Sequence, residues 1–142
     1  DWAHVEDDEL LAAAPANHPM AASTQVDPDS LAGEDLILLE DGHCLRDHAL
    51  AACGLEPPRG VGEEETFAAT SLPTLVQMIG SGLGVSFLPK MAVQAGLTDK
   101  AAVTVRPLAT AHPSREIVVA WRAGSSRGVE GRLLADTLRQ AV

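Results

Sequence analysis

The residues with the clearest capacity for chemistry are two cysteines, Cys44 and Cys53, which are the only thiols among the 142 residues of the chain. Cys44 follows His43 directly, and Arg46 stands two residues further on. Positive charge beside a thiol stabilises the thiolate, which is the form that attacks oxidants. Cys53 lies among alanines and a glycine and has no such neighbour. This contrast predicts Cys44 as the attacking thiol and Cys53 as the partner that captures its sulfenic acid.

A helix is expected to begin beside Cys44 and to present this thiol. The pattern predicts a helix over 45–52 that ends before Gly54. A helix N-terminus carries partial positive charge, which favours the thiolate of Cys44. Asp41 and Asp47 act in the opposite direction, so the sequence leaves the net effect open.

The same helix separates the two cysteines. Nine residues at ~1.5 Å each place their Cα atoms roughly 13 Å apart, and ~100° per residue turns them to opposite faces. A disulfide requires Cα atoms within about 7 Å of each other. The two sulfur atoms therefore cannot join until residues 45–52 unwind. Such a disulfide would act as a switch between two conformations and not as a structural link.

Two other interpretations of the cysteines stay open at this point. Free cysteines are often buried and only fill space in a core. A metal site is the second alternative, because Cys44 and His48 are spaced to share a helix face and His43 is adjacent. A closed zinc site requires four ligands, and Cys53 would point away from the others. We therefore expect neither a metal nor a cofactor.

The elements around the cysteines alternate between short apolar strands and helices, which is the pattern of an α/β fold. Asp27 is placed to cap a short helical turn, and either Ser71 or Thr70 is placed to cap a helix. The glycines at 80, 82 and 84 follow a helix instead of opening one, so they indicate a turn and not a dinucleotide site. The expected strands are 10–14, 35–39, 67–69, 85–88, 103–105 and 116–121, and the other expected helices are 72–79, 89–95 and 130–142.

Two segments have a distinct surface character. Residues 130–142 show an amphipathic pattern, in which Leu133, Leu134 and Leu138 are expected to face inward. Residues 56–65 hold two prolines, two glycines and four glutamates, which is typical of a surface loop.

The composition limits the classes of function. Acidic residues outnumber basic ones by 20 to 10, and no segment concentrates lysine and arginine. This segment therefore lacks the electrostatic footprint of a nucleic-acid-binding surface. The longest apolar runs are too short to cross a bilayer, and the start of the chain lacks both a methionine and the features of a signal peptide. We expect a fragment of about one domain that works in the reducing cytoplasm without a membrane partner.

The stretch 42–47, Gly-His-Cys-Leu-Arg-Asp, closely resembles the OxyR family of LysR-type transcriptional regulators. The second cysteine stands at the interval found in that family, nine residues after the first. This combination is specific, whereas the other similar segments are typical of LysR-type effector domains in general. Those segments are 29–34, 69–75, 82–89 and 115–122, and the similarity runs from about Asp8 to the end of the chain.

The resemblance implies an α/β fold of the periplasmic-binding-protein type, with two subdomains joined by crossover strands. It implies that residues 1–142 hold the switch subdomain of a LysR effector domain nearly whole and the other subdomain in part. The DNA-binding helix-turn-helix and the first part of the effector domain are then absent from this segment.

The resemblance also implies roles for individual residues. In that family a peroxidatic cysteine reacts with hydrogen peroxide and forms a disulfide with a resolving cysteine, which rearranges a dimer or tetramer. Carried over, Cys44 is peroxidatic and Cys53 is resolving. The residues expected to shape the peroxide site are His43, Arg46, Asp47 and Arg115. For Arg115, the sequence alone favours an ordinary ion pair with Glu116 or with a carboxylate elsewhere.

Three functions compete on this basis. The first is a redox-sensing regulatory domain whose signal is hydrogen peroxide and whose parent protein binds promoter DNA of oxidative-stress genes through a separate domain. The second is a LysR-type effector domain that binds a small organic inducer and has incidental cysteines. The third is a thiol peroxidase or oxidoreductase, which the chain does not favour because it lacks a Cys-x-x-Cys motif. We expect the first function and no enzymatic turnover.

Overall fold

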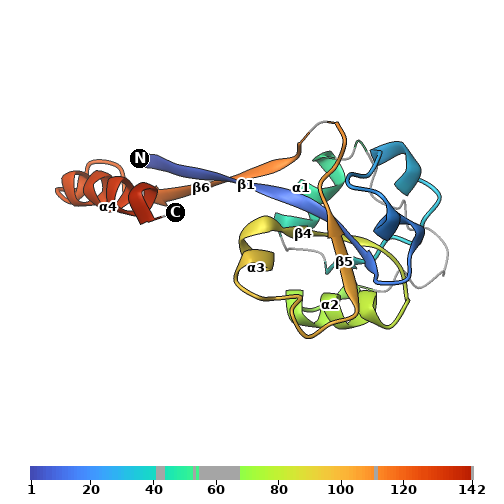
Figure 1. Cartoon of the computed structure of the whole chain (residues 1–142). Helices are drawn as coiled ribbons and strands as arrows, with labels where there is room; N and C mark the ends of the chain where they lie inside the picture. The colour runs from blue at the N-terminus through green and yellow to red at the C-terminus, as the bar shows by residue number, and fades with distance from the viewer. Residues whose placement is uncertain (41–43, 53, 55–67, 111, 142) are drawn as a thin grey trace. The chain divides into compact units, whose positions relative to one another are not determined.

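The computed structural model describes residues 1–40, 44–52, 54, 68–110 and 112–141. The chain divides into two units: unit 2 is Glu9–Pro113, and unit 1 is Asp1–Asp8 together with Ser114–Val142. The strand β1, Trp2–Pro15, contributes its first half to unit 1 and its second half to unit 2. Helices and strands alternate along the chain (Figure 1), as the α/β prediction requires.

An antiparallel sheet lies at the centre of unit 2, with β1 between β4, Ser86–Pro89, and β5, Val103–Arg106. Ala13 of β1 is opposite Ser86 on one side and Val105 on the other. Both edges of β1 are thus paired within this unit. Successive residues of a strand point to opposite faces of its sheet, so this sheet has two faces to cover.

Two apolar clusters cover these faces: the Phe87 cluster and the Leu88 cluster, each called after a residue of β4. In the Phe87 cluster, buried side chains from β1 and β4 meet those of the segment that follows β1. In the Leu88 cluster, the opposite face of the sheet packs against the helix α2, Leu72–Gly80 (Figure 1). The Phe87 cluster consists of Leu10, Ala12, Ala14, Met20, Val26, Leu31, Ala49, Val85, Phe87 and Leu108. The Leu88 cluster consists of Ala13, Ile37, Leu39, Ala69, Leu75, Val76, Ile79 and Leu88.

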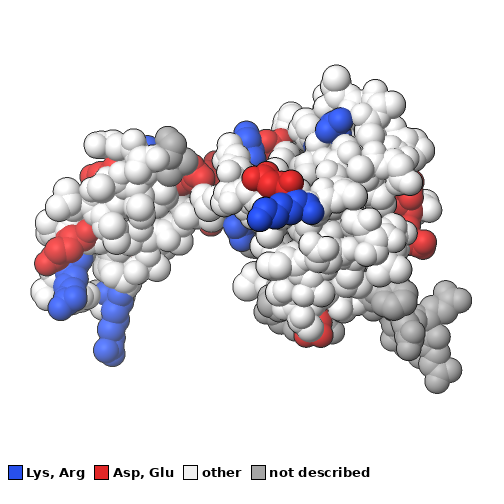
Figure 2. All heavy atoms as spheres, turned by 60° about the horizontal axis from the view of Figure 1, so that its bottom comes forward, with Lys and Arg blue, Asp and Glu red and all other residues white. Residues whose placement is uncertain are grey.

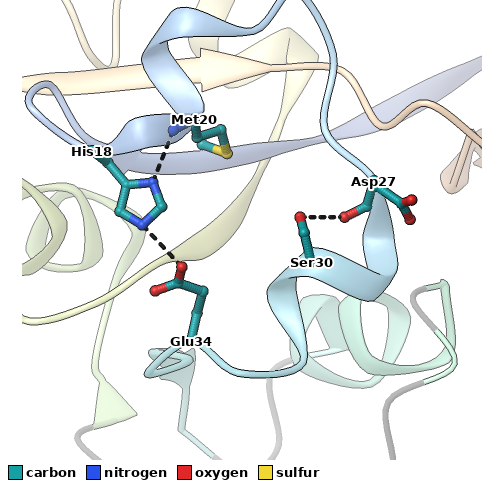
Figure 3. Close-up of polar contacts among 5 residues, drawn as sticks. All are labelled: His18, Met20, Asp27, Ser30 and Glu34. Atoms are coloured by element: carbon teal, nitrogen blue, oxygen red, sulfur yellow. Dashed lines mark hydrogen bonds and ion pairs between the residues drawn. The ribbon is translucent and has the colours of Figure 1, made fainter.

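A network of local hydrogen bonds shapes the segment between β1 and α1. It contains two 3-10 turns, η1 at Pro19–Ala22 and η2 at Pro28–Leu31. His18 caps η1, because its Nδ1 accepts a hydrogen bond from the Met20 amide at 3.1 Å while its Nε2 lies 3.1 Å from Glu34 Oε1 (Figure 3). The ring therefore links the start of the first turn to the chain that leaves the second.

The cap predicted at Asp27 is confirmed, and of the two candidates for the cap of α2 the structure has Ser71. Asp27 caps η2, since its carboxylate accepts a hydrogen bond from the amide two residues further on at 3.0 Å. Ser71 caps α2, and its Oγ accepts from the Thr74 amide at 3.3 Å. Each cap satisfies an amide that the first helical turn leaves without a partner.

The predicted strand 35–39 is shorter in the structure, where β2 is Leu38–Leu39 and Leu36 makes one isolated bridge to Val85. β2 pairs in parallel with β3, Ala68–Ala69, which covers the described part of the predicted strand 67–69. The chain continues from β4 into α3, Lys90–Gln94. Phe67 and the predicted loop 56–65 lie outside the described residues.

Unit 1 consists of the first half of β1, the strand β6, Ser114–Ala120, and the helix α4, Gly128–Ala141. β6 pairs with β1, and the strand pairing ends in reciprocal backbone hydrogen bonds between Asp1 and Trp121. The Nε of Arg139 donates from α4 to the carbonyl oxygen of His4 at 2.8 Å. The last expected strand and helix are thus confirmed as elements.

The expectation that the leucines of the last helix face inward is wrong. The helix packs against the strand through small residues instead: Ala135 is buried, and a Cβ on Gly131 would overlap the ring of Trp121. The ring of Trp121 therefore lies against the small residues of α4 and not against the leucines. The exposed fractions of the leucines are 65% for Leu133, 51% for Leu134 and 39% for Leu138.

Gly84 enables a close backbone approach, and its replacement by alanine should destabilise unit 2. A Cβ at this position would overlap the carbonyl oxygen of Asp35, which accepts a hydrogen bond from the Val85 amide at 2.9 Å. We expect Gly84→Ala to lower the free energy of unfolding by about 2–4 kcal/mol. Urea denaturation followed by far-UV circular dichroism measures this.

The matched control is Gly33→Ala, because no heavy atom lies within 4 Å of a Cβ built there. It should change the free energy of unfolding by less than about 0.5 kcal/mol. Equal effects of the two substitutions would show that the approach of Asp35 to Gly84 is not a constraint on this fold.

Candidate redox site

Cys44 is the first residue of the helix α1, Cys44–Ala52, and its thiol is exposed and not in a disulfide. The predicted helix and the position of the thiol at its N-terminus are therefore confirmed. The first turn of a helix leaves backbone amides without helical partners, and its dipole favours negative charge there. The structure thus leaves the thiol at the start of α1 accessible to a small oxidant.

The segment that leads to α1 is hydrogen-bonded through its backbone to other parts of unit 2. The amide of Ile37 donates to the carbonyl oxygen of Val85 at 2.8 Å, and the buried Ser86 Oγ donates to the carbonyl oxygen of Ile37 at 2.6 Å. The Glu40 amide donates to the Ala69 carbonyl oxygen at 3.1 Å. These bonds fix the chain on its way to the helix that carries Cys44.

The apolar face of α1 packs against the rest of unit 2. Ala49 and Leu50 are buried, and Ala49 belongs to the Phe87 cluster. Leu45 is half-buried and packs against both the Phe87 cluster and the Leu88 cluster. The exposed face of the helix carries Cys44, Asp47, His48 and Ala51.

The structure places only some of the predicted site residues around the thiol. Arg46 is half-buried and Asp47 is exposed, both in the first turn of α1. His43 and Cys53 lie outside the described residues. Cys44, Arg46 and Asp47 therefore share one turn, and the roles assigned to all of these residues stay predictions.

Arg115 of β6 forms an ion pair with Asp8 of β1. Its Nε donates to Asp8 Oδ2 at 2.9 Å, and one Nη lies 2.8 Å from the same oxygen. The side chain of Asp8 is 1% exposed, so the guanidinium of Arg115 is paired with a buried carboxylate. A pair with a carboxylate elsewhere was the interpretation that the sequence favoured, and this is confirmed. Arg115 belongs to unit 1 and Cys44 to unit 2.

Sequence reasoning missed Asp8 as a structural carboxylate. The two partners are 107 positions apart, and Asp8 stands in a run of acidic residues that reads as solvent-facing in the sequence. The alternation of side chains along a strand was the one usable signal for Asp8, because one residue of an acidic run in a strand can point inward while its neighbours face solvent.

Charged side chains are interspersed on the described surface. On the face drawn in Figure 2, basic side chains are few and several stand beside acidic ones. Lys90, for example, lies 3.7 Å from Glu9, and Arg106 donates to the carbonyl oxygens of Ser23 and Ala21. No basic patch suited to nucleic acid is visible on that face.

Within the described residues, no group of three or more His, Cys, Asp and Glu side chains is arranged to hold a metal ion. In the same part of the chain, no helix has the length and apolar character to cross a membrane.

Comparison with known protein families decides the classification. The family model described as the LysR substrate binding domain matches residues 1–142. The chain belongs to this LysR family. It is 39% identical over 124 residues to the "Hydrogen peroxide-inducible genes activator" of Pectobacterium carotovorum, and 38% identical over 133 residues to the "DNA-binding transcriptional dual regulator OxyR" of Escherichia coli K12. These matches cover 87% and 94% of this LysR-type chain, but only 40% and 42% of the two relatives.

Solved structures agree with this classification. The reduced regulatory domain of OxyR2 from Vibrio vulnificus is similar with a TM-score of 0.81 and 34% identity, over 100% of this chain and 65% of that one. The reduced OxyR regulatory domain of Pseudomonas aeruginosa has a TM-score of 0.79 and 34% identity, over 99% of this chain and 66% of that one. The resemblance to OxyR and the LysR effector-domain fold predicted from the sequence are both confirmed.

Removal of the Arg115 guanidinium should destabilise unit 1. Arg115→Ala takes away the positive partner of a buried carboxylate, which costs about 3–5 kcal/mol in comparable sites. Both tryptophans, Trp2 and Trp121, belong to unit 1, so their fluorescence during urea denaturation reports on this unit. The control is Arg122→Ala at an exposed position, which should shift the transition little. Coincident transitions for the two variants would contradict a stabilising role for the Asp8–Arg115 pair.

Proposed function

We propose that this chain is the redox-sensing part of a transcription regulator, in which hydrogen peroxide oxidises Cys44 and a reversible disulfide with Cys53 follows. The observation that carries the proposal is the exposed thiol of Cys44 at the N-terminus of α1. The names of the relatives support hydrogen peroxide as the signal. Regulation, and not turnover of a substrate, is the function common to the LysR relatives, so we propose no enzymatic activity.

The chemistry needs only the two thiols and peroxide. The Cys44 thiolate attacks one oxygen of hydrogen peroxide, the O–O bond breaks, and the departing hydroxide takes up a proton to become water. The resulting sulfenic acid then condenses with the Cys53 thiol, which forms the S–S bond and releases a second water. Peroxide gains two electrons and each cysteine sulfur loses one. Both steps balance without a cofactor or a metal.

The intact helix opposes the second step. The nine residues of α1 place the Cα atoms of Cys44 and Ala52 about 12 Å apart along the helix axis. A disulfide holds its two Cα atoms within about 7 Å. Because Cys53 directly follows Ala52 in the sequence, a disulfide between Cys44 and Cys53 requires α1 to lose helical structure. Oxidation would in this way change the surface that α1 forms, which is the output of the switch.

Four further residues have proposed roles in the reaction with peroxide. His43 and Arg46 would supply positive charge near Cys44, and Asp47 would hold the loop as a structural partner. Arg115 would orient peroxide. Its pair with Asp8 is compatible with this role, because the pair engages Nε and one Nη while a guanidinium presents five N–H donors.

The rest of the parent protein would transmit the signal. The chain spans less than half of the two curated relatives described above, and a full-length OxyR structure from Pseudomonas aeruginosa is matched over 50% of its length. We propose that DNA binding at promoters of oxidative-stress genes belongs to the remaining part, in a homodimer or tetramer in the cytoplasm. A small-molecule inducer is the second candidate, because the matching family model describes a substrate binding domain.

Peroxide treatment followed by peptide mass mapping tests the proposal. With the purified chain and one equivalent of hydrogen peroxide, we expect a peptide pair linked through Cys44 and Cys53 within minutes. Cys44→Ser should abolish both the linkage and peroxide consumption. Cys53→Ser should instead leave a sulfenic acid on Cys44 that dimedone traps.

The control treats the oxidised chain with dithiothreitol, which should restore both thiols. If both thiols survive peroxide unchanged in the chain and also in its parent protein, the redox proposal is wrong. The inducer hypothesis then predicts that ligands shift the unfolding transition equally in the chain and in a variant with both cysteines replaced by serine.

A further inference from the structure

The residue directly after the reactive thiol has an unusual place in the packing. Among the described residues of α1, Leu45 packs against both the Phe87 cluster and the Leu88 cluster. The unit 2 sheet separates these clusters, because consecutive residues of β4 belong to different ones. One side chain reaches both faces only at an edge of that sheet. The segment before α1 lies at such an edge, where Leu36 bridges Val85.

Leu45 therefore joins the helix to the two halves of the apolar core. Ala49 contributes to the Phe87 cluster alone, and the polar side chains of the first turn lie toward solvent or are half-buried. If α1 unwinds near its N-terminus, Leu45 leaves both clusters together. These apolar contacts therefore stabilise only the helical state with two free thiols, and they are lost when the disulfide forms.

We propose that Leu45 is the positioning residue that sets the reduction potential of the Cys44–Cys53 pair. This inference rests on the proposed function. The role assigned to this side chain is indirect. It acts through α1, by stabilising the conformation in which the two sulfurs are held apart. Access of peroxide to Cys44 and restraint of the disulfide are thus assigned to two consecutive residues, of which the first is exposed and the second half-buried.

The substitution Leu45→Ala separates packing from helix propensity. Alanine is a better helix former than leucine, so this change does not weaken α1 intrinsically. It removes the side-chain atoms that reach the clusters. We expect the disulfide to be favoured about tenfold more than in the unsubstituted chain, which corresponds to a reduction potential roughly 30 mV more negative. Leu45→Met, which keeps an apolar side chain of similar volume, should return the potential close to its original value.

The measurement is a redox titration of the 142-residue chain in buffers of reduced and oxidised glutathione. The fraction of Cys44–Cys53 disulfide is quantified by alkylation and peptide mass mapping. The matched control is Leu134→Ala, the same chemical change at a leucine of α4 that is 51% exposed. It should leave the potential unchanged. A far-UV circular dichroism spectrum confirms that each variant is folded, and Leu45→Val replaces Leu45→Ala if the latter is not.

The outcomes separate the two proposals. A potential shifted by Leu45→Ala, rescued by Leu45→Met and unaffected by Leu134→Ala supports the inference. A residue with only a structural role would lower the unfolding midpoint of both redox forms and leave the potential in place, and that result would overturn the inference while the switch stands. If the unsubstituted chain forms no Cys44–Cys53 disulfide at any buffer ratio, the proposed function fails and the inference fails with it.

Discussion

The pairing of β1 on both of its edges is the constraint on which the rest of unit 2 depends. Because β4 and β5 occupy those edges, the residues of β1 can only alternate between two covered faces. Ala12, Ala13 and Ala14 are almost fully buried there. Three consecutive small side chains leave room for larger ones, such as Phe87 on one face and Leu88 on the other. The other elements of the unit then pack against one or both of these clusters, and this packing fixes their positions within the unit.

This arrangement explains how an exposed thiol and a well-packed helix coexist. Under the proposed function, the thiol must be reachable by a small polar oxidant, whereas the helix that carries it must be held until the thiol reacts. In α1 the exposed Cys44 precedes the half-buried Leu45, and Ala49 and Leu50 continue the buried face. The helix is short, so its stability comes from this packing and not from propensity. Under the proposed function, a conformational change at its first turn would therefore reach the core through few contacts.

Unit 1 shows a different solution to packing a helix on a strand. Gly131 and Ala135 let α4 approach Trp121 closely, and the guanidinium of Arg132 lies 5.7 Å from the centre of that ring. Tight contact through small residues leaves the leucines of the helix on the outside. The buried pair of Asp8 and Arg115 adds a polar link between the two strands of this unit. An uncompensated carboxylate at the same place would carry a large desolvation cost.

The sequence by itself determined the features that depend on neighbouring residues. The caps at Asp27 and Ser71 and the helix that begins at Cys44 follow from side chains that act within one turn. The OxyR resemblance likewise came from a short motif. Tertiary structure alone decided which face of α4 is buried, because amphipathic periodicity identifies an apolar stripe and not the surface that will cover it. It also decided that Arg115 pairs with Asp8, a partner 107 positions away that only the pairing of β6 with β1 brings within reach.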